Sequence, residues 1–382
     1  MFASYFAYQL IDFALALFGM RLVLKFADGE RARRRFATPL RRFLFAGVPA
    51  ALAGFALFAL LCLTLLHHVV GALGWQLQHR PISITFLGIG AAFYAGLLLV
   101  PLVAVWRAQK RARLLALTWL AASVTLMGWM MFVEPDRIEL TTTEVALAKW
   151  PADAKPLRIV ILSDIQTPLT TERERRIPAL VQSLAPDLIV LPGDLAGQSF
   201  DDTLPAAAAR AILSQLSAPL GIYAVNGDVD CFTPGGLEAI VAGTTTRALS
   251  NEWVRLDGTP VELFGADFNE TDPLATAIAK PPLAPIRIAF VHRPDFVDTF
   301  GPAGFDLVIA GHTHGGQVVL PWIGPPITKS GLPRAIAAGG LHPRAGTLLY
   351  VSRGVGMEAG FAPPMRLNCR PEIALLIVRG PR

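Results

Sequence analysis

The chain has 382 residues, of which 53% are hydrophobic and only 16% are charged. It is therefore too apolar for a single ordinary soluble domain. Its formal net charge of +5 does not indicate a nucleic-acid partner, because much of the arginine excess lies beside apolar segments near the N-terminus.

Long apolar segments dominate the N-terminal part of the chain, and each can cross a hydrocarbon core of about 30 Å as a helix. Helices of a large soluble core are the alternative, but those are normally striped with polar residues. A cleaved signal peptide is disfavoured because the segments repeat. They carry no central charge of the kind that marks an ion path, so we predict a four-helix transmembrane anchor over residues 1–135. The segments cover residues 6–24, 43–66, 82–106 and 114–133.

Basic residues beside these segments set the predicted orientation. They crowd the connections at residues 31–42 and 110–113, whereas the middle connection is nearly uncharged. Because basic residues are enriched on the cytoplasmic side of a membrane, we predict that these two connections are cytoplasmic. The chain then leaves the membrane on the outer side near Glu134. A linker at 136–155 and the domain that follows are therefore predicted to be extracytoplasmic.

Short apolar runs bounded by Gly, Pro and Asp replace the long segments from residue 156 onward. Helix-like segments at 172–184 and 206–216 lie between some of these runs. We therefore predict an α/β sandwich of two packed β-sheets flanked by helices over residues 156–382. The runs with strand length and β-branched or aromatic bias are 157–162, 188–191, 222–225, 261–264, 286–291, 307–310 and 348–351.

Side chains with oxygen or imidazole groups follow five of these runs directly. A strand that ends at a tight glycine turn holds such a side chain rigidly at the rim of a sheet. Taken alone, each aspartate could be a turn former or a helix cap, and each histidine a structural residue. Together they favour a metal site, and mixed carboxylate and imidazole ligands suit Zn, Mn or Fe better than Ca or Mg. The residues are Asp164, Gln166, Asp194, Asp228, His292, His312 and His314.

This series of motifs resembles the calcineurin-like metallophosphoesterases, whose pattern is D-x-H, G-D-x-x-D, G-N-H-D/E, H and G-H-x-H. The stretches GHTHGGQVVLP, LLYVSRGVG and RLNCRPEIALL are similar to a membrane-anchored bacterial branch, which is related to the transmembrane proteins with a metallophosphoesterase domain. The resemblance covers residue 157 to the C-terminus. It implies a calcineurin-like fold and a metal-dependent hydrolase that acts on phosphoric ester bonds.

The resemblance also implies two divalent ions, Mn, Zn or Fe, which share a bridging hydroxide as nucleophile and neutralise the phosphate oxygens. Asp194 would bridge the two ions, because a carboxylate has two oxygens to share. The first ion would be held by Asp164, Gln166, Asp194 and His314. The second would be held by Asp194, Asp228, His292 and His312. We assign catalytic roles to Asp228, Asp230 and His292.

Three ligand or support positions depart from the family pattern. Gln166 stands where the family has a histidine, and its side-chain oxygen can still bind a metal. Gly197 replaces a supporting aspartate, and Asp228 replaces a ligand asparagine. Three aspartates and a hydroxide would balance two divalent ions, so we expect tighter metal retention and weaker attraction of anions than is usual for the family.

Val229 stands where the family has the histidine that assists catalysis. General acid help of that kind is typically worth about 10²–10⁴-fold, so we expect a slower reaction. Asp230 or His342 could replace it in part, or the leaving group could need no protonation, as with a nucleotide phosphate.

The sequence therefore predicts a membrane-anchored dimetal phosphohydrolase of the bacterial inner membrane, either a phosphodiesterase or a pyrophosphatase. The tether would favour a lipid-linked phosphate substrate. Hydrolysis of UDP-2,3-diacylglucosamine, known for membrane-associated relatives, is an alternative that the predicted outward orientation opposes. A degenerate, non-catalytic member that binds a phosphorylated lipid or a protein partner is a second alternative. Gln166, Gly197 and Val229 favour it, and the retained ligands oppose it.

The three cysteines are divided between the two predicted regions. Cys62 lies in a predicted span, whereas Cys231 and Cys369 lie in the outer domain, where a disulfide is chemically permitted. Spacing alone does not show whether the two form a bond.

Overall fold

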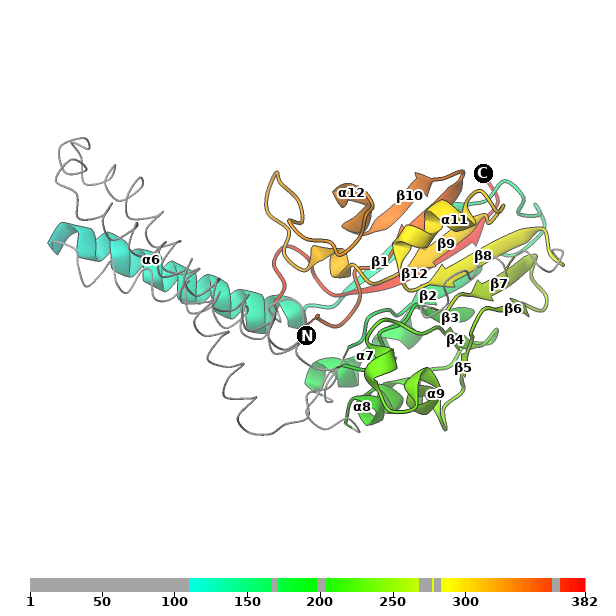
Figure 1. The fold of residues 1–382 in the computed structure, drawn as a ribbon, viewed down its shortest axis with the longest axis horizontal. Helices are drawn as coiled ribbons and strands as arrows, with labels where there is room; N and C mark the ends of the chain where they lie inside the picture. The colour runs from blue at the N-terminus through cyan, green and yellow to red at the C-terminus, as the bar shows by residue number, and fades with distance from the viewer. Residues whose placement is uncertain are drawn as a thin grey trace, which may run out of the picture. The chain divides into compact units, whose positions relative to one another are not determined.

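The chain forms two compact units in the computed structural model (Figure 1). The structure describes residues 110–166, 171–197, 204–267, 277, 283–358 and 365–381. Unit 1 comprises Met1–Trp129 and Ala359–Pro364, and unit 2 comprises Met130–Glu358 and Met365–Arg382.

Helix α6 (Lys110–Gly128) is the described element of unit 1. It continues into a π-helical segment, Trp129–Val133, so the fourth predicted span is helical along its length. Among the described residues, no helix is both long and apolar enough to cross a membrane. The predicted spans at 6–24, 43–66 and 82–106 lie outside the described residues.

Two six-stranded sheets make up the body of unit 2. In the first sheet β2, β3, β4 and β5 run parallel, and β12 joins β2 antiparallel. Its order is β1 (Glu139–Ala146), β12 (Glu372–Arg379), β2 (Leu157–Ile161), β3 (Leu188–Leu191), β4 (Ile222–Ala224) and β5 (Thr246–Ala248).

The second sheet has a parallel centre and antiparallel edges. Strands β11, β9, β8 and β7 run parallel, and β10 and β6 are the antiparallel edge strands. The order is β10 (Gly340–Arg344), β11 (Thr347–Val351), β9 (Leu307–Ala310), β8 (Ile286–Val291), β7 (Val261–Gly265) and β6 (Glu252–Arg255).

Alternation of side chains along the strands builds the core between the sheets. In β2, Ile159 belongs to the cluster that contains Ile288 and Ile309 of the second sheet. Its neighbour Val160 belongs to a different cluster, with the helices of the first sheet. Because successive strand residues point to opposite faces, an apolar run such as β2 can pack on both sides. The predicted α/β sandwich is therefore confirmed.

Helices cover the outer face of each sheet (Figure 1). The first sheet packs against α7 (Glu172–Ser183), α8 (Leu204–Leu213) and α9 (Gly236–Val241). The second packs against α11 (Val297–Phe300) and α12 (Arg334–Ala337). Short 3-10 helices lie at Glu134–Asp136, Asp230–Phe232, Pro294–Phe296 and His314–Gly316.

Every strand that the sequence predicted is present, with bounds that differ by at most one residue. Strands β1, β5, β6, β10 and β12 were not predicted. The stretch expected to be a linker, 136–155, contains β1, whose threonine-rich side chains are mostly exposed or half-buried, so that the apolar signal is weak. The apolar run of β12 was a usable signal that the prediction missed.

Candidate metal centre

The predicted site residues follow the carboxyl ends of five parallel strands. Asp164 and Gln166 follow β2, Asp194 follows β3, and Asp228 follows β4. In the second sheet the histidines follow β8 and β9. Because the carboxyl ends of parallel strands share one edge of a sheet, each sheet presents its ligands at a single edge. The structure brings the two edges together.

One group of side chains combines Asp164, Asp194 and His314, all buried. Their candidate ligand atoms lie within 4.8 Å of one another. Nε2 of His314 is 3.6 Å from Oδ1 of Asp164, which is too long for a hydrogen bond. The three side chains are therefore arranged around a common point rather than bonded to each other.

A second group combines Asp228, His292 and His312, whose candidate ligand atoms also lie within 4.8 Å of one another. Nε2 of His292 is 3.3 Å from Oδ1 of Asp228. It also lies 3.5 Å from Oδ2 of Asp194, a member of the first group. Asp194 therefore stands between the two groups.

Orphaned buried atoms show that these residues fit a cation. Both ring nitrogens of His314 are buried and have no hydrogen-bond partner among the described residues. The same holds for Oε1 of Gln166, whose Nε2 donates to Oδ2 of Asp194 over 2.7 Å. Buried polar atoms are normally paired, and a lone-pair donor left unpaired is the expected state of a metal ligand without its ion. Imidazole and carboxylate together suit a transition metal.

Two histidine rings are oriented by backbone carbonyls. Nδ1 of His292 is 2.9 Å from the carbonyl oxygen of Pro192, and Nε2 of His312 is 3.1 Å from that of Lys329. If these nitrogens carry the protons, the opposite nitrogen of each ring presents a lone pair to the site. Those two nitrogens are 3.1 Å apart. Two lone pairs at that separation repel unless a proton or a cation lies between them.

Left-handed backbone conformations occur at most of the predicted ligands. Such values are uncommon outside glycine and cluster at functional sites, where surrounding contacts hold them. The φ angles are 50° at Asp164, 37° at Gln166, 56° at Asp194, 70° at His312 and 49° at His314.

Two glycines allow the ligand loops to approach each other. A Cβ added to Gly227 would lie 2.0 Å from Oδ1 of Asp194. A Cβ added to Gly311 would lie 1.9 Å from Oγ of Ser163 and 2.4 Å from Oδ2 of Asp164. Any side chain at either position would displace a candidate ligand carboxylate.

Asp230 is fully buried, and the structure gives it backbone partners instead of an open position. Its carboxylate accepts hydrogen bonds from the amides of Asp194, Leu195, Ala196 and Gly227 over 2.8–3.1 Å. These amides belong to the loops after β3 and β4. Asp230 therefore ties together two loops that carry candidate ligands, a role that the sequence did not suggest.

The position of the missing histidine is occupied by a buried apolar side chain. Val229 is 4% exposed, and its amide donates to Oδ1 of Asp194 over 2.9 Å. His342, the other suggested substitute, lies in β10, where Nε2 is 3.0 Å from the carbonyl oxygen of Gly339. His342 belongs to neither of the two groups.

Burial and mutual charge set the pKa values of the site. Burial raises the pKa of Asp164 to about 6 and also raises that of Asp194 well above its usual value. Burial lowers the pKa of His292, but Asp194 and Asp228 outweigh burial and raise it to about 10. Burial and the charge of His292 lower the pKa of His312 to about 3. The raised pKa values of Asp194 and His292 favour their protonated forms, whereas the lowered pKa of His312 favours its neutral form.

Arg366 is a buried cation that sequence reasoning missed, although it begins the quoted RLNCR stretch. Its guanidinium is fully buried and donates to the carbonyl oxygens of Gly354 and Gly356. It also donates to the carbonyl of His314 over 3.4 Å. Arg366 thus stabilises the loop that carries His314 through hydrogen bonds to its backbone. Cys231 and Cys369 are both free thiols, Cys231 exposed and Cys369 buried.

Lys329 is a second cation that was missed. Nζ lies 2.7 Å from Oε2 of Glu358, and the side chain is 28% exposed. Its charge contributes to the lowered pKa of His312 and of His314. Lys329 therefore lies within electrostatic range of both groups.

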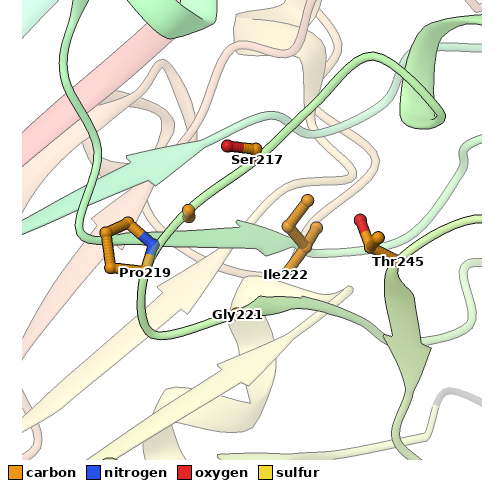
Figure 2. Close-up of a pocket in the computed structure, with 6 residues that line it drawn as sticks. Ser217, Pro219, Gly221, Ile222 and Thr245 are labelled. Carbon is orange, nitrogen blue, oxygen red and sulfur yellow. The ribbon is translucent and has the colours of Figure 1, made fainter.

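A surface depression on the first sheet is separate from this site. It lies at the start of β4, whereas the candidate ligands lie beyond the ends of the strands (Figure 2). Its lining contains no metal-binding side chain. The lining residues are Ser217, Ala218, Pro219, Gly221, Ile222 and Thr245.

Comparison with known proteins gives related sequences, although no protein-family model matches the chain. Phosphodiesterase YaeI of Escherichia coli (strain K12) is 30% identical over 279 residues, which cover 70% of this chain and 98% of YaeI. The transmembrane protein with metallophosphoesterase domain of Bos taurus is 30% identical over 318 residues, 72% of this chain and 66% of the relative. UDP-2,3-diacylglucosamine pyrophosphatase LpxG of Chlamydia muridarum is 27% identical over 294 residues, 62% of this chain and 89% of LpxG.

Proposed function

The chain belongs to the calcineurin-like metallophosphoesterases and is a phosphoester hydrolase, and we propose that it is a dimetal phosphodiesterase or pyrophosphatase anchored in a membrane. The observation that carries the dimetal proposal is the pair of ligand groups on either side of Asp194. Each group brings together carboxylate and imidazole atoms at the rim of the sandwich. Mn, Zn and Fe are the ions that suit this mixture.

We assign the first ion to Asp164, Gln166, Asp194 and His314, and the second to Asp194, Asp228, His292 and His312. Two bound divalent ions would supply an activated water nucleophile and neutralise the oxygens of the phosphate under attack. The side chain of Asp228 is 25% exposed, whereas those of Asp164 and Asp194 are buried. Asp228 is therefore the most accessible of the three carboxylates, and we infer that a substrate reaches the ions from its side.

Few side chains near the proposed ions could protonate a leaving group or neutralise the phosphate. Val229 has no proton to give, and Asp230 holds four backbone amides. Lys329 would add positive charge beside the phosphate, held in place by Glu358. We therefore infer that the substrate carries a leaving group that departs without protonation by the protein.

A membrane-borne, lipid-linked phosphate is the substrate class that we favour. Two of the relatives support it by name, one as a transmembrane protein and one as a UDP-2,3-diacylglucosamine pyrophosphatase. A tether to the bilayer raises the local concentration of such a substrate. We propose that residues 1–135 form the anchor in a bacterial inner membrane and that unit 2 is extracytoplasmic. Hydrolysis of UDP-2,3-diacylglucosamine itself remains the alternative that the similarity to LpxG favours.

Hydrolysis by the full-length chain tests this proposal. Bis(p-nitrophenyl) phosphate has a leaving group that needs no acid, so wild-type protein loaded with Mn or Zn should hydrolyse it. Asp194→Ala should abolish turnover, because it removes a ligand common to both ions. Asp298→Ala is the matched control, since Asp298 is 48% exposed and pairs with Arg344 on the surface. Equal rates in wild type and Asp194→Ala would favour a non-catalytic binding protein.

A further inference from the structure

One loop of unit 2 exposes large apolar side chains. We define the apolar loop as Leu320–Ile327, which lies between the His314–Gly316 turn and α12. Trp322 is 103% exposed, Ile327 72% and Ile323 62%. These are three of the five most exposed large hydrophobic side chains among the residues that the structure describes. In Figure 1 the orange loop before α12 extends away from both sheets.

Backbone hydrogen bonds hold the tip of this loop in a tight turn. The carbonyl of Leu320 accepts from the amide of Gly324 over 2.9 Å, and the carbonyl of Gly324 accepts from the amide of Leu320 over 3.1 Å. Trp322 sits between them at a φ of 63°. A bulky residue in the left-handed region is disfavoured and persists where the surrounding contacts hold it. The exposed tryptophan is therefore a defined feature of the turn.

The C-terminal end of the apolar loop lies beside the candidate metal centre. Pro325 and Ile327 cover Gly316, where an added Cβ would lie 2.4 Å from Cβ of Pro325 and 2.7 Å from the carbonyl oxygen of Ile327. Gly316 is two residues from His314. Just beyond the same end of the loop, the carbonyl of Lys329 lies 3.1 Å from Nε2 of His312. Because Ile327 and Lys329 are two residues apart, their Cα atoms are at most about 7 Å apart. The loop forms part of the rim of the site.

The charge around the apolar loop suits an anionic surface. Residues 307–357 carry four basic residues and no aspartate or glutamate. Three of the four form ion pairs with carboxylates from elsewhere in the chain, Lys329 with Glu358, Arg344 with Asp298 and Arg353 with Glu139. Arg334 is exposed, seven residues after Ile327. Tryptophan with aliphatic neighbours and nearby basic side chains is the composition of segments that lie at a membrane interface.

We propose that the apolar loop docks on an anionic phospholipid bilayer, with Trp322, Ile323 and Ile327 inserted at the interface, and holds the metal centre at the level of lipid phosphates. Docking itself does not depend on turnover and so goes beyond the proposed hydrolysis. The preference for a membrane-borne substrate that follows from docking rests on the proposed function. Membrane docking and substrate preference are distinguished by measuring contact with lipid and hydrolysis in separate experiments.

Photocrosslinking of the full-length chain tests contact without any need for activity. Benzoylphenylalanine replaces Ile323 in one variant and Asp257 in the other, and each is reconstituted with vesicles of phosphatidylcholine and phosphatidylglycerol. Asp257 is the matched control because it is exposed in the turn before β7, at the opposite end of the parallel strands from the site. We expect lipid adducts at position 323 and none at 257. No lipid adduct at 323, equal adducts at both, or adducts to a second protein chain would overturn the proposal.

Kinetics then test what docking does for the substrate. The variant Trp322→Ser/Ile323→Ser should lose about tenfold or more of its rate on a diacyl phosphodiester in the same vesicles, because the site is no longer held at the interface. Its rate on soluble bis(p-nitrophenyl) phosphate should stay close to that of wild type. Equal loss on both substrates would contradict the docking role. A wild-type chain that hydrolyses neither substrate would contradict the proposed function and leave the crosslinking result to decide docking.

Discussion

Nε2 of Gln166 donates a hydrogen bond to Oδ2 of Asp194 over 2.7 Å, while Oε1 of the same amide is buried without a partner among the described residues. The amide therefore orients the shared carboxylate with one atom and offers a ligand oxygen with the other. Replacement of Gln166 by leucine removes both. We predict that Gln166→Leu lowers the affinity for one ion by about 10–100-fold or more, the loss typical of a missing supporting contact. The second ion should be retained. Metal titration monitored by mass spectrometry measures this, and unchanged affinity of both ions would contradict it.

Asp228 adds a negative charge at a position where the family has asparagine. Removing that charge by Asp228→Asn should increase metal loss during dialysis, because the site then has one negative charge fewer for two divalent ions. The same change should strengthen the binding of an anionic inhibitor such as phosphate. Metal content after dialysis and phosphate inhibition are the measurements. Unchanged retention of metal would show that the charge of Asp228 does not stabilise the bound ions.

Val229 leaves the site without the acid that the family supplies from this position. We expect the rate of wild-type protein to fall steeply as the leaving group becomes a poorer one. Val229→His should flatten that dependence, with a gain of up to about 10²-fold on an alkyl ester and little change on a p-nitrophenyl ester. Val229→Leu is the size control, because it fills the position without adding a proton donor. Equal gains on both esters would sink the idea.

A substitution at Asp230 distinguishes a positioning role of this residue from general acid catalysis. The change Asp230→Asn removes one acceptor oxygen and places an NH2 group against backbone amides that are themselves donors. We expect the free energy of unfolding to drop by about 1–3 kcal/mol for each amide left unpaired, together with loss of bound metal. Thermal unfolding and metal content are the readouts, with Asp298→Asn as the exposed control. The variant could instead keep its full metal content and stability and lose only one limb of the pH profile of its activity. That result would make Asp230 a general acid.

Metal binding should release protons near neutral pH. The pKa of His292 is raised to about 10 in the absence of metal, so the ring is protonated below that value and must lose its proton to become a ligand. Affinity for metal therefore rises as the pH rises from 6 toward 10 and falls as the pH falls. Calorimetric titrations in buffers of different ionisation enthalpy measure the number of protons released at pH 7. A value of zero would contradict the raised pKa.

Much of the site could be predicted because its residues follow strands directly in the sequence. A polar residue after a buried run must lie at the end of a strand, and parallel strands place those ends together. Asp164 and His312, 148 residues apart, could be grouped on this basis.

Other features depend on contacts that no local pattern encodes. Asp230 looked like a substitute acid because it is next to Val229, and only the fold shows that its carboxylate reaches amides of the loop after β3. Lys329 lies in a loop without strand or helix signals, so nothing in its surroundings linked it to His312. Strand β1 has exposed or half-buried threonines and forms through pairing with β12, at the other end of the domain sequence.

The number of ions that share Asp194 tests the dimetal centre most directly. Full-length protein, loaded with Mn or Zn and freed of excess metal, should contain two ions per chain by elemental analysis. Asp194→Ala should contain none, because both ligand groups lose a member, whereas Asp298→Ala should still contain two. A wild-type chain that holds a single ion, or an Asp194→Ala chain that keeps both, would contradict a centre in which one carboxylate serves two ions.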